Sequence, residues 1–488
     1  MRSSAAELCR NIKRDNDLLP MEQSTGAAVD AAYAEIDWAE LETAGFDKRG
    51  DYCFIYSYPP VRTLVPIEPD AMFTPSEWEP PADLVNVYVH IPYCSGICSY
   101  CYFTKVVDTG RSVVSKDDYI DLLIRELAWK FERYNSSARI ANVHFGGGTP
   151  SILEPRQIER IMAFMQSMAG QSAFEVTFEC APETIHNDMD KLRLMRDCGV
   201  TRINVGVESL DDRVLKIMAR RHGSAMTLRS LDNIRRVGFD NVNVDLIYAL
   251  PGQSLASWID TLRLIAALKL ESVSVYRLRR HPMKRISKLE SGLYPSYEAG
   301  LKMQLAHGIV MVGEGYRRVQ SHKYAISGDK IQQQTERKRG IGNTQLLSAG
   351  CGSYGFLNST LYWNTKSLGQ WGESLRQGLH PTWRGATLDR DGLMRKTMVL
   401  GVHTSHGIDR REFTSKFGVD PVSVFPAEIS SAVSLGLFRV TEEAIRPTEL
   451  GYFFGDELSV SFYSEAVRRQ LSRLGMTYGM FFEQDMYA

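Results

Sequence analysis

The chain has 488 residues, which is long enough to bury a large core and to form more than one domain. Hydrophobic residues make up 44% and charged residues 24%, and the formal net charge is -1, so the totals give no sign of a basic nucleic-acid-binding surface. No apolar run reaches the roughly 18 residues that span a bilayer, and Met1 to Arg14 lacks the apolar segment of a secretory signal. We therefore expect a cytoplasmic protein with no nucleic-acid or membrane partner.

Residues 1–83 form a leading segment that we expect to wrap around the domain that follows. A helix-like run covers Ala27 to Leu41, and Phe54 to Pro60 is predicted to be extended because residues before proline avoid the helical region. Closely spaced prolines then mark a linker-like stretch: Pro66, Pro69, Pro75, Pro80 and Pro81. This segment cannot form a core by itself.

From Leu84 onwards, short apolar strands alternate with amphipathic helices. The expected strands are Val85–Ile91, Ile140–Phe145, Phe174–Phe178, Arg202–Val207, Val242–Ile247 and Ser272–Tyr276. The expected helices between them are Asp117–Tyr134, Pro155–Met168, Asp188–Cys198, Asp211–Met218, Ala225–Val237 and Ser254–Leu268. This alternation predicts right-handed βαβ units and a parallel sheet. Six units are too few for a closed eightfold barrel, so we expect an α/β fold with a partial (β/α)6 barrel that binds ligands at its C-terminal strand ends.

The alternation weakens after Leu278. A helix over Tyr297–Val312, a strand-like Tyr316–Gln320 and a glycine-rich turn that includes Tyr354 are expected next. We assign residues 84–375 to the barrel with its extension, and residues 376–488 to a small, mainly helical winged domain with a tail. The elements expected in that domain are helices Arg390–Leu400, Asp409–Phe417 and Pro421–Leu435 and a hairpin Phe438–Arg446. The tail from residue 474 could cover the barrel mouth or bind a carrier protein.

The cysteines divide into one cluster and five isolated residues. The isolated ones are interpreted as small buried hydrophobic residues: Cys9, Cys53, Cys180, Cys198 and Cys351. Cys94, Cys98 and Cys101 follow the first strand with the spacing C-x3-C-x2-C. A structural zinc site usually needs a second ligand pair, which the sequence lacks, and three inert cysteines in one loop are the other alternative. We favour a 4Fe–4S cluster, because three thiolates leave one iron open to a substrate or cofactor.

The triplet, placed at the end of a first strand in a β/α chain, resembles the radical S-adenosylmethionine (SAM) superfamily. Longer segments resemble the oxygen-independent coproporphyrinogen III oxidase-like (HemN-like) family: YVHIPYC from Tyr88, FGGGTPS from Phe145, RINVGVES from Arg202 and NVDLIYALPGQ from Asn243. YSYPP from Tyr56 and WRGATLDRD from Trp383 are similar to that family too, so the likeness covers roughly residues 50 to 460. It implies a radical SAM barrel, a 4Fe–4S cluster and two SAM molecules.

The resemblance also implies roles for individual residues. Cys94, Cys98 and Cys101 would bind the cluster. The residues that would contact SAM are Tyr88, Tyr100, Gly147, Gly148, Thr149, Glu179, Glu208, Arg220, Asp245 and Tyr354. Glu208, Tyr88 and Tyr100 are the candidate catalytic residues.

The residue types suit these roles, although structural alternatives exist for each. Glycines at a strand end let the backbone approach a ligand closely, and an arginine such as Arg220 can pair with the methionine carboxylate. The alternatives are a tight turn for the glycines, a solvated strand end for Glu179, a surface helix charge for Arg220 and simple packing for the two tyrosines. His281, at a strand end near Arg279 and Arg280, could meet an acidic substrate, but a solvated basic loop is favoured.

Two departures from the family pattern bear on function. Phe103 stands where coproporphyrinogen oxidases usually carry another cysteine, and Glu208 stands where the family usually has glutamine. Because the further cysteine is missing while Glu208, Arg220 and Asp245 remain as candidates for the second SAM, we rank first a methylase or cyclopropanase of specialised metabolism. Such an enzyme uses two SAM molecules to transfer a methyl or methylene group to an sp2 carbon. Oxidative decarboxylation of coproporphyrinogen III is the alternative, supported by the leading segment and the C-terminal domain. A heme chaperone ranks last, because that branch tends to lack the leading segment.

The expected partners follow from this family resemblance. They are a small-molecule substrate, free or bound to a carrier protein, and an external electron donor such as flavodoxin or ferredoxin. We expect the protein to act as a monomer.

Overall fold

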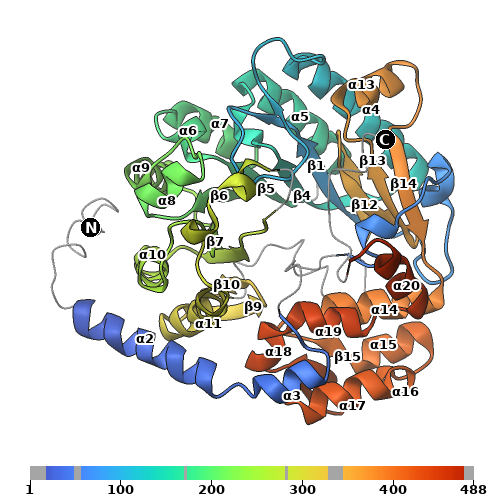
Figure 1. Ribbon diagram of the computed structural model, residues 1–488. Helices are drawn as coiled ribbons and strands as arrows, with labels where there is room; N and C mark the ends of the chain where they lie inside the picture. Colours follow the sequence, from blue (N-terminus) through green and yellow to red (C-terminus); the bar gives the residue numbers. More distant parts are fainter. Residues whose placement is uncertain (1–17, 49–56, 170–172, 281–283, 328–344, 477–488) are drawn as a thin grey trace.

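One curved sheet of twelve strands organises the protein (Figure 1). The structure is a computed structural model that describes residues 18–48, 57–169, 173–280, 284–327 and 345–476. Six neighbouring parallel strands form the middle of the sheet: β1 (Leu84–Ile91), β4 (Arg139–Gly147), β5 (Glu175–Cys180), β6 (Arg202–Glu208), β7 (Val242–Tyr248) and β8 (Ser272–Arg277). They match the six strands expected from the sequence, and the α/β partial barrel is confirmed.

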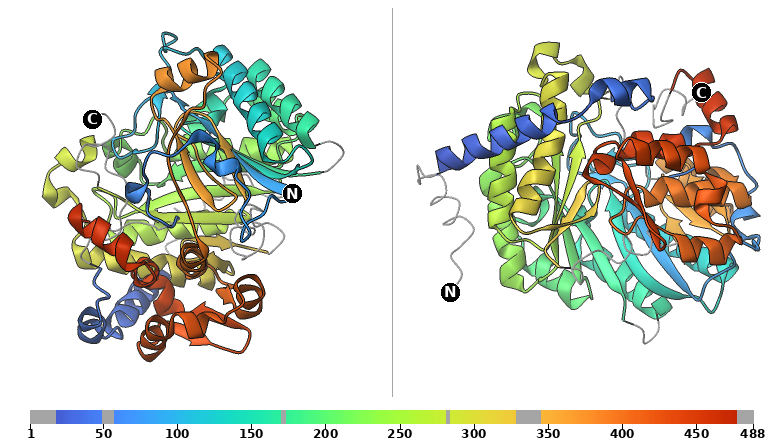
Figure 2. Two further views of the ribbon diagram at one scale, coloured as in Figure 1. Left: turned by 90° about the vertical axis from the view of Figure 1, so that its right-hand side faces the viewer. Right: turned by 90° about the horizontal axis from the view of Figure 1, so that it is seen from below.

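Helices cover the outer, convex face of these strands (Figures 1 and 2). They are α4 (Lys116–Tyr134), α5 (Pro155–Ala169), α6 (Pro182–Ile185), α7 (Met189–Asp197), α8 (Asp212–Ile217), α9 (Ser224–Val237) and α10 (Leu255–Ala267). Each buries the apolar stripe that its sequence predicts; α4, for example, begins at the cap Ser115 and buries Tyr119, Leu123 and Leu127. The helices thus leave the concave face and the C-terminal strand ends for a ligand.

The sheet continues beyond the parallel strands at both edges. β11 (Leu346–Ala349) runs parallel to β1 and is followed by the antiparallel strands β12 (Tyr354–Leu357), β13 (Thr360–Asn364) and β14 (Thr382–Thr387). At the other edge β8 pairs with β10 (Lys323–Ala325), and β10 with β9 (Arg317–Gln320). The remaining elements of this region are α11 (Tyr297–Gly313), α13 (Leu368–Arg376), β2 (Tyr93–Cys94), β3 (Val106–Val107), η3 (Pro150–Ile152), η4 (Arg285–Lys288) and η5 (Ser291–Leu293). β14 lies past residue 375, where the sequence analysis began the C-terminal domain.

The C-terminal part has its own apolar core, built from helices and a small sheet. Its helices are α14 (Arg390–Gly401), α15 (Arg410–Phe417), α16 (Pro421–Val424), α17 (Pro426–Ser434), α18 (Glu449–Phe453), α19 (Gly455–Ser461) and α20 (Glu465–Arg473). The strands β15 (Ile408–Asp409), β16 (Phe438–Val440) and β17 (Ala444–Pro447) form a three-stranded sheet. This is the mainly helical, winged arrangement that the sequence predicts.

The described part of the leading segment packs against both the barrel and the C-terminal part. It contains α2 (Leu18–Ala34), α3 (Trp38–Thr43), η1 (Val61–Thr63) and η2 (Pro69–Phe73). The prediction of one helix over Ala27–Leu41 was wrong, because Asp37 caps the start of α3 through the amide of Glu40 and ends any continuous helix there. Lys48 forms a buried ion pair with Glu457 of α19 at 3.2 Å, which anchors the segment to the C-terminal part.

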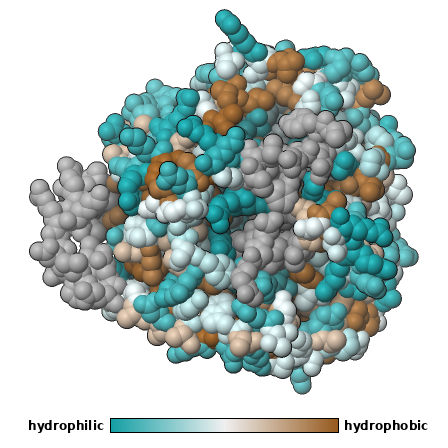
Figure 3. All heavy atoms as spheres, in the orientation of Figure 1, coloured by the Kyte–Doolittle hydropathy of each residue, from teal (hydrophilic) through white to brown (hydrophobic). Residues whose placement is uncertain are grey.

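The visible surface in Figure 3 mixes hydrophilic side chains with scattered apolar ones. Within the described ranges, no helix is long and apolar enough to cross a membrane.

Candidate active site

A cavity of about 500 Å³ lies at the C-terminal ends of the parallel strands, within the size range of small-molecule sites. All of the site residues expected from the sequence line it: Tyr88, Cys94, Cys98, Tyr100, Cys101, Gly147, Gly148, Thr149, Glu179, Glu208, Arg220, Asp245 and Tyr354. They come from segments far apart in the chain, and the parallel sheet brings them to one edge.

The three cysteines sit on the loop that follows β1, with Cys94 ending β2. All three are free thiols, and burial raises the pKa of Cys94 to about 11. Among the described residues, no group of three potential ligands is close enough to hold a single metal ion. Three free thiols on one loop suit a 4Fe–4S cluster, in which each thiolate binds a different iron and metal binding removes the thiol protons.

The glycines after β4 bring the backbone against the cysteine loop. A Cβ atom at Gly148 would lie 2.7 Å from the Tyr93 carbonyl oxygen and 2.9 Å from Cys94 Sγ, so a side chain there would displace the loop. Gly147 has φ +119, a conformation that other residues rarely adopt. Gly148 is therefore needed because its backbone lies against the cysteine loop, and Gly147 is needed because of its backbone conformation. A surface turn alone explains neither glycine.

Glu179 at the end of β5 is held by a residue that the sequence analysis missed. Its Oε1 lies 2.8 Å from His144 Nε2, and the His144 ring stacks on Tyr88 with centroids 5.8 Å apart. Tyr88 and His144 are direct partners in the β1–β4 register. Tyr88 OH also contacts His90 Nδ1 at 3.1 Å, and burial lowers the pKa of His90 to about 4, so this ring is neutral.

Arg220 occupies the centre of the opposite wall and is not a surface helix charge. Its side chain is only 10% exposed, and its Nη1 lies 3.3 Å from both Cys98 Sγ and the Tyr100 hydroxyl. Nη2 donates to the Gly206 carbonyl at 2.8 Å, and Nη1 forms an ion pair with Glu208 at 3.4 Å. Glu208 has φ 64, which places a non-glycine residue in the left-handed region at this site.

Asp245 lies deep in β7, on the wall next to Glu179. Its carboxylate accepts hydrogen bonds from Asn204 Nδ2 at 2.8 Å and from Asn243 Nδ2 at 3.0 Å. Burial and then the charge of Glu179 raise the pKa of Asp245 to about 7. The group can therefore change its charge near neutral pH.

Further cations line the cavity in addition to Arg220: Lys105, Arg277, Arg279 and Lys323. Arg279 lies over the Tyr102 ring at 5.7 Å, and Phe103, which is 53% exposed, stacks on the same tyrosine. His281 lies outside the described residues, as does Tyr56 of the leading segment. The C-terminal part also reaches the cavity, through Leu400, His403 and Thr404.

Among the isolated cysteines that the structure describes, Cys180 is the one that reaches this site. Cys180 and Cys351 are buried, as expected, while Cys198 is partly exposed. Cys180 reaches the cavity wall, and Cys9 and Cys53 lie outside the described residues.

Comparisons with known proteins agree with this geometry. Residues 88–265 match the radical SAM superfamily, and residues 388–454 match the HemN C-terminal domain. The heme chaperone HemW of Bacillus subtilis is 25% identical over 395 residues, covering 78% of this chain and 99% of its own length. The oxygen-independent coproporphyrinogen III oxidase of Salmonella typhimurium is 25% identical over 435 residues, covering 86% of this chain and 93% of its own length.

A solved structure extends the likeness to the fold of most of the chain. Coproporphyrinogen III oxidase (HemN) from Escherichia coli, a radical SAM enzyme, superposes with a TM-score of 0.75 at 23% identity and covers 88% of this chain and 99% of its own. The cysteine triplet, the barrel and both family matches agree. The chain contains a radical SAM domain and a HemN C-terminal domain, and the cofactors that go with a radical SAM domain are a 4Fe–4S cluster and SAM.

Proposed function

We propose that this radical SAM enzyme oxidatively decarboxylates the propionate side chains of coproporphyrinogen III or a closely similar tetrapyrrole. The observation that carries the proposal is that candidate cofactor-binding residues and several cations line the same cavity. The residues suited to the cluster and SAM line this cavity, and so do four further cations, Lys105, Arg277, Arg279 and Lys323. A substrate with several carboxylates is complementary to these positive charges.

A propionate that reacts loses one hydrogen atom, one CO2 and one electron and becomes a vinyl group. The electron passes to an external one-electron acceptor. When bound, the reduced cluster and SAM supply the radical that takes the hydrogen atom. The protein's task is to bind, orient and shield these groups.

Named residues are suited to each part of that task. Cys94, Cys98 and Cys101 would hold three irons and leave the fourth to SAM. Glu179, fixed by His144, would orient a SAM amine or hydroxyl group. Arg220, in the loop after α8, and Asp245, in β7, would contact a second SAM.

The leading segment supports an oxidase over a chaperone, because the heme-chaperone branch tends to lack such a segment. In this chain the described part of the segment packs on α10, α11 and the C-terminal part.

Methyl or methylene transfer, ranked first from the sequence, becomes the second candidate. The curated relatives described above are named heme chaperones or coproporphyrinogen oxidases, which supports the alternative instead. The observation that still favours methyl transfer is Phe103, which presents an aromatic ring at the cavity where a further cysteine is usual in coproporphyrinogen oxidases.

Product analysis separates the three functions. The protein is reconstituted anaerobically, reduced with dithionite and incubated with SAM, coproporphyrinogen III and an electron acceptor. We expect 5′-deoxyadenosine, CO2 and vinyl-bearing products. S-adenosylhomocysteine formed together with 5′-deoxyadenosine would instead support methyl transfer, and stoichiometric heme binding without SAM cleavage would support a chaperone.

A further inference from the structure

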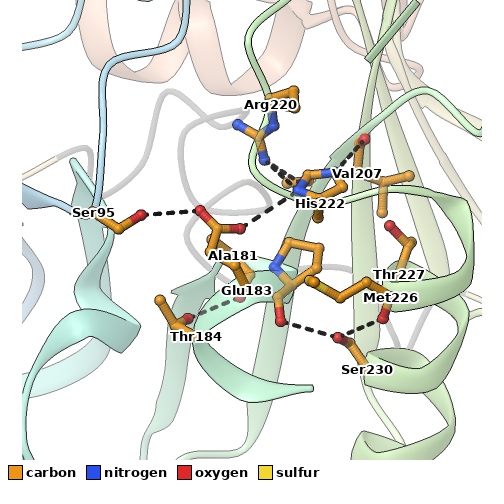
Figure 4. A network of polar contacts seen from close by, with 12 residues as sticks. Ser95, Ala181, Glu183, Thr184, Val207, Arg220, His222, Met226, Thr227 and Ser230 are labelled. Atoms are coloured by element: carbon orange, nitrogen blue, oxygen red, sulfur yellow. Dashed lines mark hydrogen bonds and ion pairs between the residues drawn. The ribbon is translucent and has the colours of Figure 1, made fainter. Parts of the chain in front are cut away.

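Behind the cysteine loop, Glu183 and His222 form a contact pair that the sequence analysis did not single out (Figure 4). Glu183 lies in the first turn of α6, directly after β5, and His222 lies between α8 and α9. His222 Nδ1 is 3.4 Å from Glu183 Oε2. His222 Nε2 is 3.2 Å from the Val207 carbonyl oxygen, which can only accept, so this nitrogen carries a proton.

The pair connects two sides of the cysteine loop. Ser95, which directly follows Cys94, donates from Oγ to Glu183 Oε1 at 3.2 Å. On the other side, Arg220 Nη2 lies 3.4 Å from His222 Nδ1, while Arg220 Nη1 lies 3.3 Å from Cys98 Sγ. A continuous chain of polar contacts thus runs from the start of the loop, through Glu183 and His222, to the arginine beside its middle cysteine.

Electrostatics explains why a carboxylate stands at this point. Burial opposes ionisation of Glu183, but its contact with His222 and the positive charge of Arg220 hold its pKa at about 2. Its Oε2 has no well-aligned hydrogen-bond partner among the described residues, although the atom is buried. An ionised oxygen in that position acts through its charge, which attracts the nearby buried guanidinium of Arg220.

We propose that Glu183 and His222 are positioning residues, which fix the guanidinium of Arg220 beside the cysteine loop so that it meets SAM in one orientation. The inference rests on the proposed role of Arg220 in SAM binding. Without the pair, Arg220 keeps its bonds to Gly206 and Glu208, so the fold survives. What is lost is the contact between His222 and the guanidinium, so the arginine is held less firmly. Part of the binding free energy of SAM must then be used to order the arginine.

Glu183→Gln and His222→Gln test the proposal in the full-length, cluster-loaded protein. Glu183→Gln keeps an acceptor for Ser95 and removes only the charge; His222→Gln keeps polar atoms without the ring. His186→Gln is the matched control, because His186 directly follows α6, the helix that carries Glu183, but contacts the Pro182 carbonyl. The readouts are iron content, melting temperature, the electron paramagnetic resonance (EPR) spectrum of the reduced cluster titrated with SAM, and KM and kcat for SAM cleavage.

We expect both variants to raise the KM for SAM about tenfold, as loss of a residue that orients a ligand does, with kcat within about twofold of the parent. The EPR change on adding SAM should need correspondingly more SAM, and iron content and His186→Gln should match the parent. The proposal is overturned if either folded, cluster-loaded variant binds SAM as tightly as the parent does. It is also overturned if the iron content of a variant falls by the same factor as its affinity for SAM. Should Glu183→Gln fail to fold, His222→Gln decides alone. A parent that binds SAM but leaves coproporphyrinogen unchanged contradicts the proposed function without touching this inference.

Discussion

Replacing Asp245 with asparagine should change how the stability of the protein depends on pH. The carboxyl is buried beside Glu179, and its pKa is about 7 in the folded protein, compared with the ordinary value of 3.8. The folded state therefore holds a proton that the unfolded state releases above about pH 4. Stability contributed at this site is greatest at low pH, falls as pH rises towards 7, and is constant above that. Asparagine carries no such proton.

The size of the effect follows from the difference between the two pKa values. About 7 minus 3.8 is roughly 3 units, an upper limit of about 4 kcal/mol at pH 8. Asp245 lines a cavity that water can enter, which should reduce this to about 2 kcal/mol. Asp245→Asn keeps the size of the side chain, so the variant should be more stable than the parent at pH 8, and its advantage should shrink towards pH 5.

Thermal unfolding of cluster-loaded protein without SAM, measured anaerobically between pH 5 and pH 8, provides the test. Asp240→Asn is the control, because Asp240 is exposed just before β7. We expect the difference in melting temperature between Asp245→Asn and the parent to grow with pH, and no such trend for the control. A difference that is constant, or that shrinks as pH rises, would refute the electrostatic reasoning.

Three further substitutions test other parts of the account. Glu126→Gln should destabilise the protein by about 3–5 kcal/mol in denaturant unfolding, because it leaves Lys130 as an unpaired charge with a fully buried side chain; a loss below about 1 kcal/mol would contradict this. Gly148→Ala should lower cluster content after reconstitution, since its Cβ would meet the cysteine loop, and iron content equal to the parent's would argue against that close approach. Arg279→Gln should raise the KM for a polycarboxylate substrate about tenfold while SAM cleavage without substrate is unchanged; an unchanged KM would remove Arg279 from the substrate site.

The sequence predicted the parallel barrel well because its strands and helices carry strong local patterns. The six strands, the outer helices and the residues at the strand ends follow from periodicity and from the family motifs. The edge strands β10 to β14 were missed because they are short, and because β11 is placed by its pairing with the distant strand β1. The break between α2 and α3 depends on one capping aspartate within an otherwise helical composition.

Contacts between neighbouring strands and between loops could not be predicted from local sequence patterns, because they depend on how distant segments pack. His144 could have been found only by knowing that it lies opposite Tyr88 in the β1–β4 register. Glu183 and His222 are 39 residues apart, as 222 minus 183 gives, and neither stands in a recognisable motif. Their partnership depends on how α6 and the segment before α9 pack behind the cysteine loop.

The most direct test of the proposed reaction follows the hydrogen atom. Coproporphyrinogen III carrying deuterium on the ring-attached carbon of its propionates is incubated anaerobically with the reduced protein, SAM and an electron acceptor. The account predicts deuterium in the 5′-deoxyadenosine, together with vinyl products and CO2. Deuterium-free 5′-deoxyadenosine accompanied by S-adenosylhomocysteine and an intact porphyrinogen would contradict it.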